Sequence, residues 1–299
     1  MNMKQFRYVL VLATEGSFSK AAETLGISQP SLSQYLKKIE KDVHATLFDR
    51  GTSEIRLTDA GHAYIDAGRK ILDIERQMEG RIADIADYKA GSLIVGISPH
   101  RAVCFMPQVI KRFNEIYPGI HIVVEERTGH ELLDRTGHGE YDLCITTAPV
   151  DPKIFNAQKI MDEEVVLAAP SQYKLETAAV PERKYPAVDL KTLNDAPLIT
   201  LSDTQIMQKL LDDQCTKFGI QYKTAVVCRS IEAQLAMVKA GLGMALVPCG
   251  IDKFGDDGVR YYSIVQQLPL REIVVAYRKE QYLSKPMKDL IEVLKEIGR

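Results

Sequence analysis

The chain has 299 residues, with 38 Lys and Arg against 40 Asp and Glu and therefore a formal net charge of −2. This length predicts about two or three domains, and the lack of any apolar run of about 18 residues excludes a membrane-spanning helix. The five scattered cysteines have no close pairs, which argues against a disulfide framework and for reduced thiols in the cytoplasm. The N-terminal stretch lacks a small-residue cleavage site, so it predicts a helix rather than a signal peptide.

Residues 17–40 have the spacing of two short helices joined by a tight turn. An apolar stripe precedes Gly26, and glycine adopts the left-handed conformation that ends a helix before such a turn. Ser28 is the expected N-cap of the second helix, with Pro30 in its first turn. This pattern indicates a helix-turn-helix whose second helix enters the major groove of DNA.

Polar side chains at the start of the second helix are suited to base edges, and nearby cations to phosphates. Gln29, Ser33 and Gln34 are expected to read bases, whereas the cations set affinity and its salt dependence. A solvated helix face is the alternative for such a motif in isolation. The residues predicted to contact DNA are Ser17, Ser28, Gln29, Pro30, Ser31, Ser33, Gln34, Lys37, Arg50 and Arg56.

Segment 49–58 predicts a β-hairpin with Gly51 at its turn, placed as a wing beside the phosphates. Residues 1–58 are therefore predicted to form a winged helix-turn-helix domain. They hold eight basic and six acidic side chains, so this head is slightly basic although the whole chain is not.

Residues 59–90 predict one long linker helix, capped by Thr58. Its apolar residues step by three or four positions in nearly a heptad seam, and such a helix needs a partner surface. We expect a second copy of the chain to supply that surface, in a homodimer or homotetramer; packing on the chain's own body is the alternative. The seam comprises Ala60, Tyr64, Ala67, Ile71, Ile74, Met78, Ile82 and Ile85.

Residues 91–299 alternate strand-like and helix-like segments, which predicts a two-lobed α/β body with mainly parallel sheets and an α+β multidomain chain overall. The expected boundaries are about 91–162 and 267–299 for lobe I, about 163–266 for lobe II, and 160–169 and 262–270 for the crossovers. Strands are predicted at 93–97, 120–125, 141–146, 164–169, 198–201, 224–228, 244–247 and 272–277. Helices are predicted at 106–117, 130–136, 205–218, 231–240 and 287–297.

The motif A-A-x-x-L-x-x-S-Q-P-S-x-S begins at Ala21 and is followed by L-F-x-R from Leu47 and L-T-x-A-G from Leu57. Together these resemble the LysR-type transcriptional regulator family, and GLGMALVP from Gly241 resembles the G-x-G-x-x-x-x-P element of its effector domain. The resemblance implies a dimerising linker helix and a two-lobed effector domain similar to periplasmic binding proteins. It also implies an oligomer that binds double-stranded promoter DNA, responds to a small-molecule effector and acts on the transcription machinery.

The wing departs from the family pattern. Many relatives carry a second basic residue shortly after the position of Arg50, whereas segment 51–54 reads GTSE here. Arg56 is the candidate substitute for that cation.

In the predicted body, hydroxyl-bearing residues follow strands and precede helices, where open α/β folds bind ligands and helix N-termini favour anions. His100 and Arg101 favour a small anion or organic acid, and Asp203 leaves an amino acid as an option. Ordinary helix capping is the alternative. The residues predicted to line the effector site are Ser98, His100, Arg101, Thr128, Gly129, Thr146, Thr147, Thr200, Ser202, Thr204, Val247 and Pro248.

The remaining patterns carry little chemistry. The glycines from Gly241 lie between a helix and a strand, so they are no dinucleotide fingerprint, and His130 and His138 lack metal-ligand spacing. Neither a cofactor, a metal nor a catalytic arrangement is expected, which disfavours an enzyme that merely carries this head. A regulator that senses oxidants through cysteine thiols stays open, although buried reduced cysteines are the default, Cys215 and Cys228 included.

Overall fold

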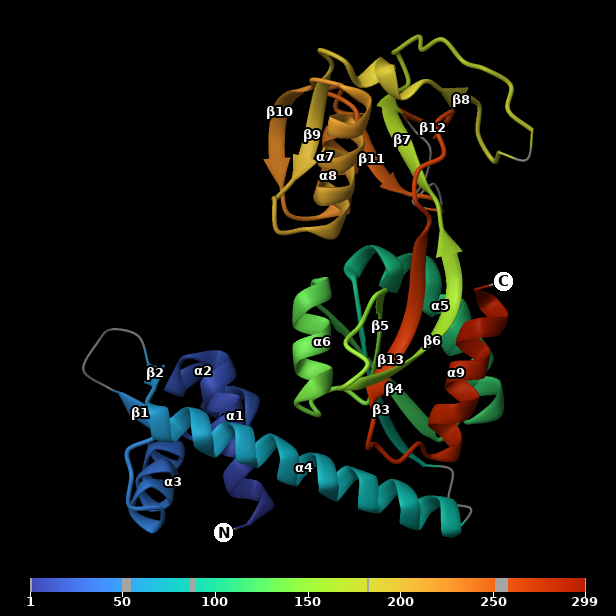
Figure 1. The fold of residues 1–299 in the computed structure, drawn as a ribbon. Coiled ribbons are helices and arrows are strands. Elements are labelled where there is room, and N and C mark those ends of the chain that lie inside the picture. The colour runs from blue at the N-terminus through green and yellow to red at the C-terminus, as the bar shows by residue number, and fades with distance from the viewer. Residues whose placement is uncertain (1, 50–54, 87–89, 182, 251–257, 299) are drawn as a thin grey trace.

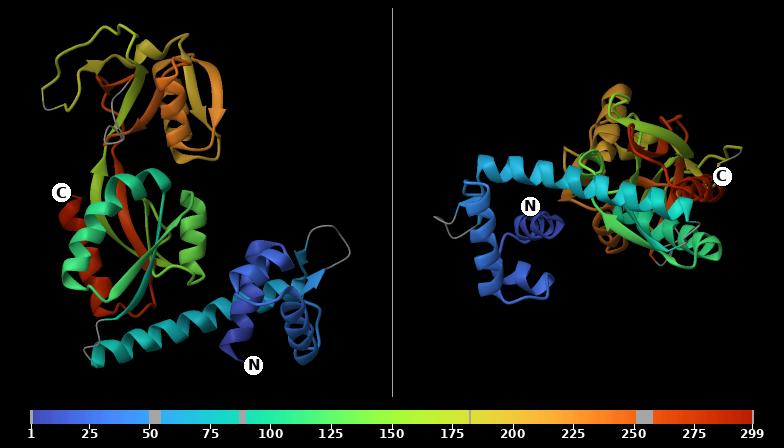
Figure 2. Two further views of the ribbon diagram at one scale, coloured as in Figure 1. Left: turned by 180° about the vertical axis from the view of Figure 1, so that it is seen from behind. Right: turned by 90° about the horizontal axis from the view of Figure 1, so that it is seen from below.

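The computed structural model describes residues 2–49, 55–86, 90–181, 183–250 and 258–298. The chain forms an N-terminal head, one long helix and a two-lobed body (Figure 1). Figure 2 shows the head at one end of the long helix and the body over its other end. The predicted architecture of head, linker helix and two-lobed α/β body is confirmed. In the described part of the chain, no helix is long and apolar enough to cross a membrane.

The head packs three helices around one apolar core. Gly26, at φ 64°, occupies the left-handed conformation expected at the turn, and the Ser28 side chain caps the following helix. Val9, Leu32 and Leu36 are among the side chains that fill the core. The elements are α1 (Met3–Glu15), α2 (Phe18–Thr24), α3 (Gln29–Asp42), β1 (Phe48–Asp49) and β2 (Arg56–Leu57), with β1 antiparallel to β2.

The linker helix α4 spans Asp59–Ile85, and the Thr58 hydroxyl caps it by accepting from the Gly61 amide. Its predicted end at Ala90 was too late, since Ala86 is the C-cap, while residues 87–89 lie outside the described part. The two sides of α4 differ. One side buries Ile65 and Gly68, whereas much of the predicted seam is open to solvent. The exposed fractions are 65% for Ile74, 54% for Met78, 57% for Ile82 and 87% for Ile85.

Lobe I is a five-stranded sheet in the order β4-β3-β5-β13-β6. Helices α5 and α9 cover one face of this sheet and α6 covers the other (Figure 1). Its elements are β3 (Gly91–Ile97), α5 (Pro99–Ile116), β4 (Ile120–Glu126), α6 (Gly129–Gly137), β5 (Leu143–Thr147), β6 (Phe155–Glu163), β13 (Arg271–Arg278) and α9 (Lys285–Ile297).

Lobe II holds one four-stranded sheet in the order β11-β7-β12-β8 and the pair β10-β9. A bridge between Leu198 and Met244 joins the two sheets. Its elements are β7 (Val165–Pro170), β8 (Ala187–Val188), the 3-10 helix η1 (Leu190–Leu193), β9 (Pro197–Leu201), α7 (Ile206–Phe218), β10 (Lys223–Cys228), α8 (Ile231–Lys239), β11 (Ala245–Pro248) and β12 (Val259–Ile264).

The chain crosses between the lobes twice, from β6 into β7 through Glu164 and from β12 back into β13. Strands β6 and β13 lie side by side and antiparallel as they approach lobe II (Figure 1). The prediction of mainly parallel sheets was therefore wrong. An outgoing and a returning strand must run in opposite directions, and β7 is likewise antiparallel to β11 and β12.

Two other element predictions also fell short. Helix α5 begins at Pro99 instead of 106, because Pro107, a typical signal for a helix start, lies inside the helix. Strands β6 and β12 were not predicted. Only Phe155, Ile160 and Glu163 of β6 are buried and most of its other side chains are polar, so its sequence lacks a continuous apolar run.

Two glycines of α4 differ in the space around them. A Cβ built on Gly61 would lie 2.1 Å from the Leu47 carbonyl oxygen, so this glycine lets α4 approach the wing backbone. A Cβ on Gly80 would meet only the Ser284 Cβ at 3.7 Å, an ordinary contact. Close packing therefore requires glycine at the first position and not at the second.

We predict that Gly61→Ala destabilises the protein by roughly 1–3 kcal/mol, because backbone must move to admit the methyl group. Gly80→Ala in the same helix should instead be neutral or stabilise by up to about 1 kcal/mol, since alanine is the better helix former. Urea unfolding followed by circular dichroism measures both. Equal losses in the two variants would contradict the packing argument.

Candidate functional sites

Helix α3 presents its polar residues on the side opposite the head core. Leu32, Leu36 and Ile39 are buried, and the remaining surface is polar. Among the predicted DNA contacts, five of α3 are exposed: Gln29, Pro30, Ser31, Gln34 and Lys37. The structure thus brings amide, hydroxyl and ammonium groups together on one accessible face.

The serines predicted to contact DNA differ in their exposure and in the hydrogen bonds that their hydroxyls already make. The Ser28 hydroxyl accepts from the Ser31 amide at 3.3 Å and lies 2.7 Å from the Ser31 hydroxyl, so both take part in capping α3. Ser33 is half-buried, and Ser17 is the half-buried N-cap residue of α2 with no side-chain capping bond. In the wing, Arg56 is exposed, while Arg50 lies outside the described residues.

Glu40 is a positioning residue that sequence analysis missed. Its Oε1 accepts from the amides of Leu47 at 2.9 Å and Phe48 at 3.4 Å, so it joins α3 to the start of the wing. The available signal was its place near the C-terminal end of α3, where the helix dipole disfavours a carboxylate. An acidic residue there needs another partner, and the wing backbone supplies it.

In the body, Arg101 connects lobe I residues that the sequence predicted to line one effector site. Its Nε and Nη2 donate to the two oxygens of Glu163 at 3.1 and 2.9 Å. Its Nη1 donates to the Ser98 hydroxyl and its Nη2 to the Thr147 hydroxyl, both at 3.3 Å. Three predicted effector residues, Ser98, Arg101 and Thr147, therefore form one hydrogen-bonded group at the edge of lobe I that faces the crossovers.

Arg271 completes this group from the returning strand β13. Its Nη1 donates to Glu163 at 2.7 Å and its Nη2 to the Thr147 hydroxyl at 3.2 Å. Burial lowers the pKa of Arg271 to about 10, although the negative charge of Glu163 acts to raise it. We name Arg101, Glu163, Arg271 and Thr147 the crossover cluster. Sequence analysis missed Glu163 and Arg271, because their strands had to be paired before the two residues could meet.

His100 is buried beside the crossover cluster. Burial, followed by the charges of Arg101 and Arg271, holds the pKa of His100 well below its ordinary value. The imidazole is therefore neutral near pH 7, and its buried Nε2 has no hydrogen-bond partner among the described residues.

The other predicted effector residues occupy different surroundings. The Thr128 hydroxyl donates to Glu131 at 2.9 Å, while Thr146 is buried next to Thr147. Thr200 is buried and donates to the Val226 carbonyl at 3.3 Å. In β11, Val247 belongs to the lobe II core and Pro248 pairs with Val165 at a crossover.

Gly129 and Ser202 mark where the two lobes face each other. A Cβ on Gly129, at the start of α6, would lie 3.9 Å from the Ile206 Cδ1 at the start of α7. The half-buried Ser202 and the exposed Thr204 lie 3.3 Å apart, hydroxyl to hydroxyl, in the turn before α7. The N-terminal ends of α6 from lobe I and α7 from lobe II therefore lie close together between the lobes.

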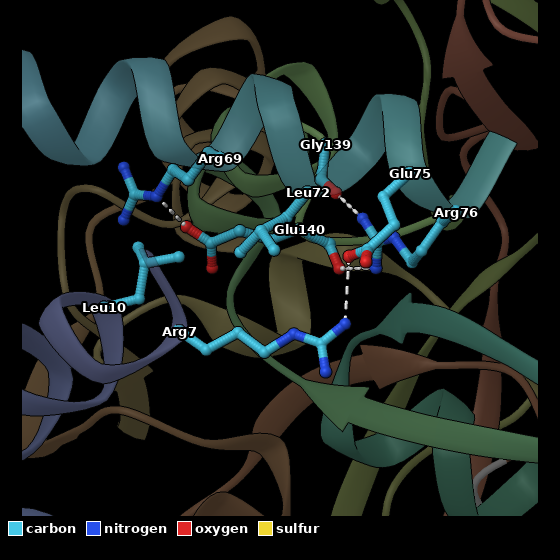
Figure 3. A pocket seen from close by; sticks show the side chains of 8 residues that line it. All are labelled: Arg7, Leu10, Arg69, Leu72, Glu75, Arg76, Gly139 and Glu140. Carbon is cyan, nitrogen blue, oxygen red and sulfur yellow. Dashed lines mark hydrogen bonds and ion pairs between the residues drawn. The ribbon is translucent and has the colours of Figure 1, made fainter. Parts of the chain in front are cut away.

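A second polar region lies where head, linker and body meet (Figure 3). A pocket of about 310 Å³ is lined there by Arg7, Leu10, Arg69, Leu72, Glu75, Arg76, Gly139 and Glu140. Arg7 of the head pairs with Glu75 of α4 at 2.9 Å, and Arg69 of α4 pairs with Glu140 of lobe I at 2.7 Å. Arg76 donates to the Gly139 carbonyl. The linker helix therefore contacts both neighbours through ion pairs.

A buried ion pair anchors α4 on lobe I. Asp73 lies 2.5 Å from the Arg278 guanidinium, which also donates to the Thr136 carbonyl at 2.8 Å. Near the end of α4, Asp84 accepts from the Tyr282 hydroxyl at 2.9 Å. The alternative prediction, packing of α4 on the chain's own body, thus describes its polar side, whereas the exposed apolar seam is left for another surface.

Comparisons with known proteins agree with this architecture. Residues 3–62 match the family described as "Bacterial regulatory helix-turn-helix protein, lysR family", and residues 86–299 match the "LysR substrate binding domain". The chain belongs to the LysR family of transcriptional regulators, a family whose members carry a DNA-binding head and an effector-binding domain.

Relatives and solved structures of this family cover the whole chain. An uncharacterized HTH-type transcriptional regulator, YcgK of Bacillus subtilis, is 29% identical over 99% of this chain and 94% of its own. A probable RuBisCO transcriptional regulator of Synechocystis is 28% identical over 99% and 86%. The crystal structure of CbnR, a LysR family transcriptional regulator, aligns with a TM-score of 0.72 at 22% identity, covering 100% of both chains.

We predict that Asp73→Asn destabilises the body by roughly 1.5–3 kcal/mol, because it removes the carboxylate that hydrogen-bonds the largely buried Arg278 guanidinium. Asp66→Asn is the matched control on the same helix. Asp66 lies 3.7 Å from Arg69 with 55% of its side chain exposed, so its loss should cost about 0–1 kcal/mol. Urea unfolding compares the two. An Asp73 variant as stable as the control would show that the ion pair does not anchor α4.

Proposed function

We propose that the chain acts in the cytoplasm as a homo-oligomeric regulator that reads promoter DNA through α3 and responds to a small molecule bound between its lobes. This proposal depends on one observation: the same chain has an exposed polar face on α3 and a polar region between the lobes of its body. The probable RuBisCO regulators among its relatives and a structure of CbnR in complex with its target DNA support the same reading of the head.

The exposed side of α4 supports an oligomer. Four large apolar side chains of one helix side are open to solvent in the single chain, and soluble proteins seldom leave such a stripe uncovered. Their near-heptad spacing suits packing against the same helix of a second copy. A two-fold pair of heads would then address two half-sites of an operator.

The interlobe region supports a small polar effector. Ser98, Arg101 and Thr147 offer donors on one side, and the turn with Ser202 and Thr204 offers hydroxyls on the other. The chemistry fits a small anion, an organic acid or an amino acid. A ligand that contacts both sides would favour one arrangement of the lobes over another.

We predict that Gln29→Ala and Lys37→Gln weaken DNA binding in different ways. Removing the Gln29 amide should cost about 1–3 kcal/mol of discrimination between operator and random DNA. Removing the Lys37 charge should weaken binding to both DNAs alike and reduce the salt slope of log K by about one. Fluorescence anisotropy with both DNAs over a range of salt concentrations separates the two effects.

Lys295→Gln, on α9 of the body and far along the chain from α3, serves as the charge-matched control and should leave both quantities unchanged. Unchanged discrimination in the Gln29 variant would remove the base contact from the proposal. Loss of discrimination in the Lys37 variant would assign base reading to that residue instead.

A thiol-based sensor is the second candidate, and one contact favours it. The Sγ of Cys104, in α5 of lobe I, lies 3.7 Å from the carbonyl oxygen of Gly250. Gly250 directly follows Cys249 of lobe II in sequence, and both cysteines are half-buried. The buried thiols fit poorly. Burial raises the pKa of Cys144 to about 12 and that of Cys215 to about 11, which leaves almost no reactive thiolate.

If the effector is a ligand and not an oxidant, all five cysteines should still react with iodoacetamide in denaturant after the native protein has been treated with peroxide. Mass spectrometry counts the labelled cysteines. Loss of label at Cys104 and Cys249 together, restored by a reductant, would favour the thiol sensor. Alanine variants of these two residues keep the readout specific.

A further inference from the structure

The crossover cluster holds two buried cations and one buried carboxylate. The side chains of Arg101, Glu163 and Arg271 are only 6%, 6% and 9% exposed. Both guanidiniums donate to the same carboxylate, so one positive charge is left over. Among the described residues, Glu163 is the only carboxylate that hydrogen-bonds either arginine. The adjacent Glu164 pairs with Arg183 instead.

A buried excess charge is costly unless a counterion offsets it. Among the residues that the structure describes, Glu163 is the only acidic group that acts on the pKa of Arg271. His100 is neutral, and the two groups beside it that act on its pKa are both arginines. The cluster therefore favours an anion from outside the chain.

Two buried nitrogens at the cluster have no hydrogen-bond partner within the described structure. They are the His100 Nε2 and the Arg271 Nε, and both residues are more than nine-tenths buried. Ser98 is the N-cap residue of α5, yet its hydroxyl makes no capping bond and instead accepts from Arg101. The first amides of α5 consequently add to the positive potential.

The cluster also spans both crossovers. Glu163 ends the outgoing strand β6, Arg271 begins the returning strand β13, and the two residues are directly paired in register. Any ligand that binds the arginines therefore contacts the two segments that must bend when the lobes move relative to each other.

We propose that the effector is a small organic carboxylate with no ammonium group, whose carboxylate binds at Arg101 and Arg271 and whose second polar group, such as a hydroxyl, meets His100. This inference rests on the proposed interlobe effector site and specifies its ligand. A zwitterionic amino acid is disfavoured, because its ammonium group would bring a further positive charge to a buried site that already has one in excess.

The test uses the full chain and matched probes: sodium lactate, malate and 3-hydroxybenzoate, their neutral amides, and alanine as the zwitterionic analogue of lactate. Thermal shift and calorimetry are run at constant ionic strength set by sodium chloride. At least one carboxylate should raise the melting temperature while its amide and alanine do not. This comparison in the unaltered protein needs no variant that might fail to fold.

Two variants change the cluster charge in opposite directions. Arg271→Gln removes the excess charge and should weaken binding of the active carboxylate by at least about tenfold, the cost of one lost hydrogen bond to a charged group. Glu163→Gln increases the excess charge and should tighten binding. Arg112 lies on an exposed part of α5 and pairs with Glu115 at 2.8 Å. Arg112→Gln is therefore the control and should leave binding unchanged.

Equal shifts by carboxylates and their amides, or no shift by any carboxylate, would overturn the inference. So would weaker binding in both cluster variants, since a purely structural ion cluster predicts that result. Operator binding measured on the same samples separates this failure from a failure of the proposed function. A neutral or zwitterionic compound that shifts the melting temperature and alters operator binding would keep the regulator and discard the carboxylate.

Discussion

The buried ion pair of Asp73 with Arg278 determines how the rest of the molecule is arranged. It fixes one side of α4 on lobe I, so the opposite, apolar side must face outward. Because the same helix also pairs with the head through Glu75 and Arg7, the head takes its position from the body through α4. One helix thus has two sides of different chemistry: one side makes ion pairs with its own chain, and the other leaves Ile74, Met78, Ile82 and Ile85 exposed.

A comparable constraint acts between the lobes. In the described part of the chain two strand connections join them, and Glu163 and Arg271 lie opposite each other at the lobe I end of both. Arg101 from α5 binds the same carboxylate, so the helix that lines the interlobe region and the two connections share one charged group. Ligand binding at that group and movement of the lobes would therefore be linked by direct contact, with no need for a longer route.

The local features of the head were predictable, because they depend on near neighbours in sequence. Gly26 at the turn and Ser28 at the cap follow from backbone conformation and capping alone. The body was predicted less well. Antiparallel pairing of β13 was missed because strand direction depends on where the chain crosses between lobes, and β6 was missed because its sequence lacks a continuous apolar run.

The sequence by itself determined the family, the polar face of α3 and the presence of an apolar seam on α4, since each depends on residues a few positions apart. Only the tertiary structure decided which side of α4 meets the body and which residues form the crossover cluster. Arg101, Glu163 and Arg271 are separated by 62 and 108 positions along the chain. Their excess charge becomes costly only once folding brings the three side chains together and removes them from water, so no local pattern could reveal it.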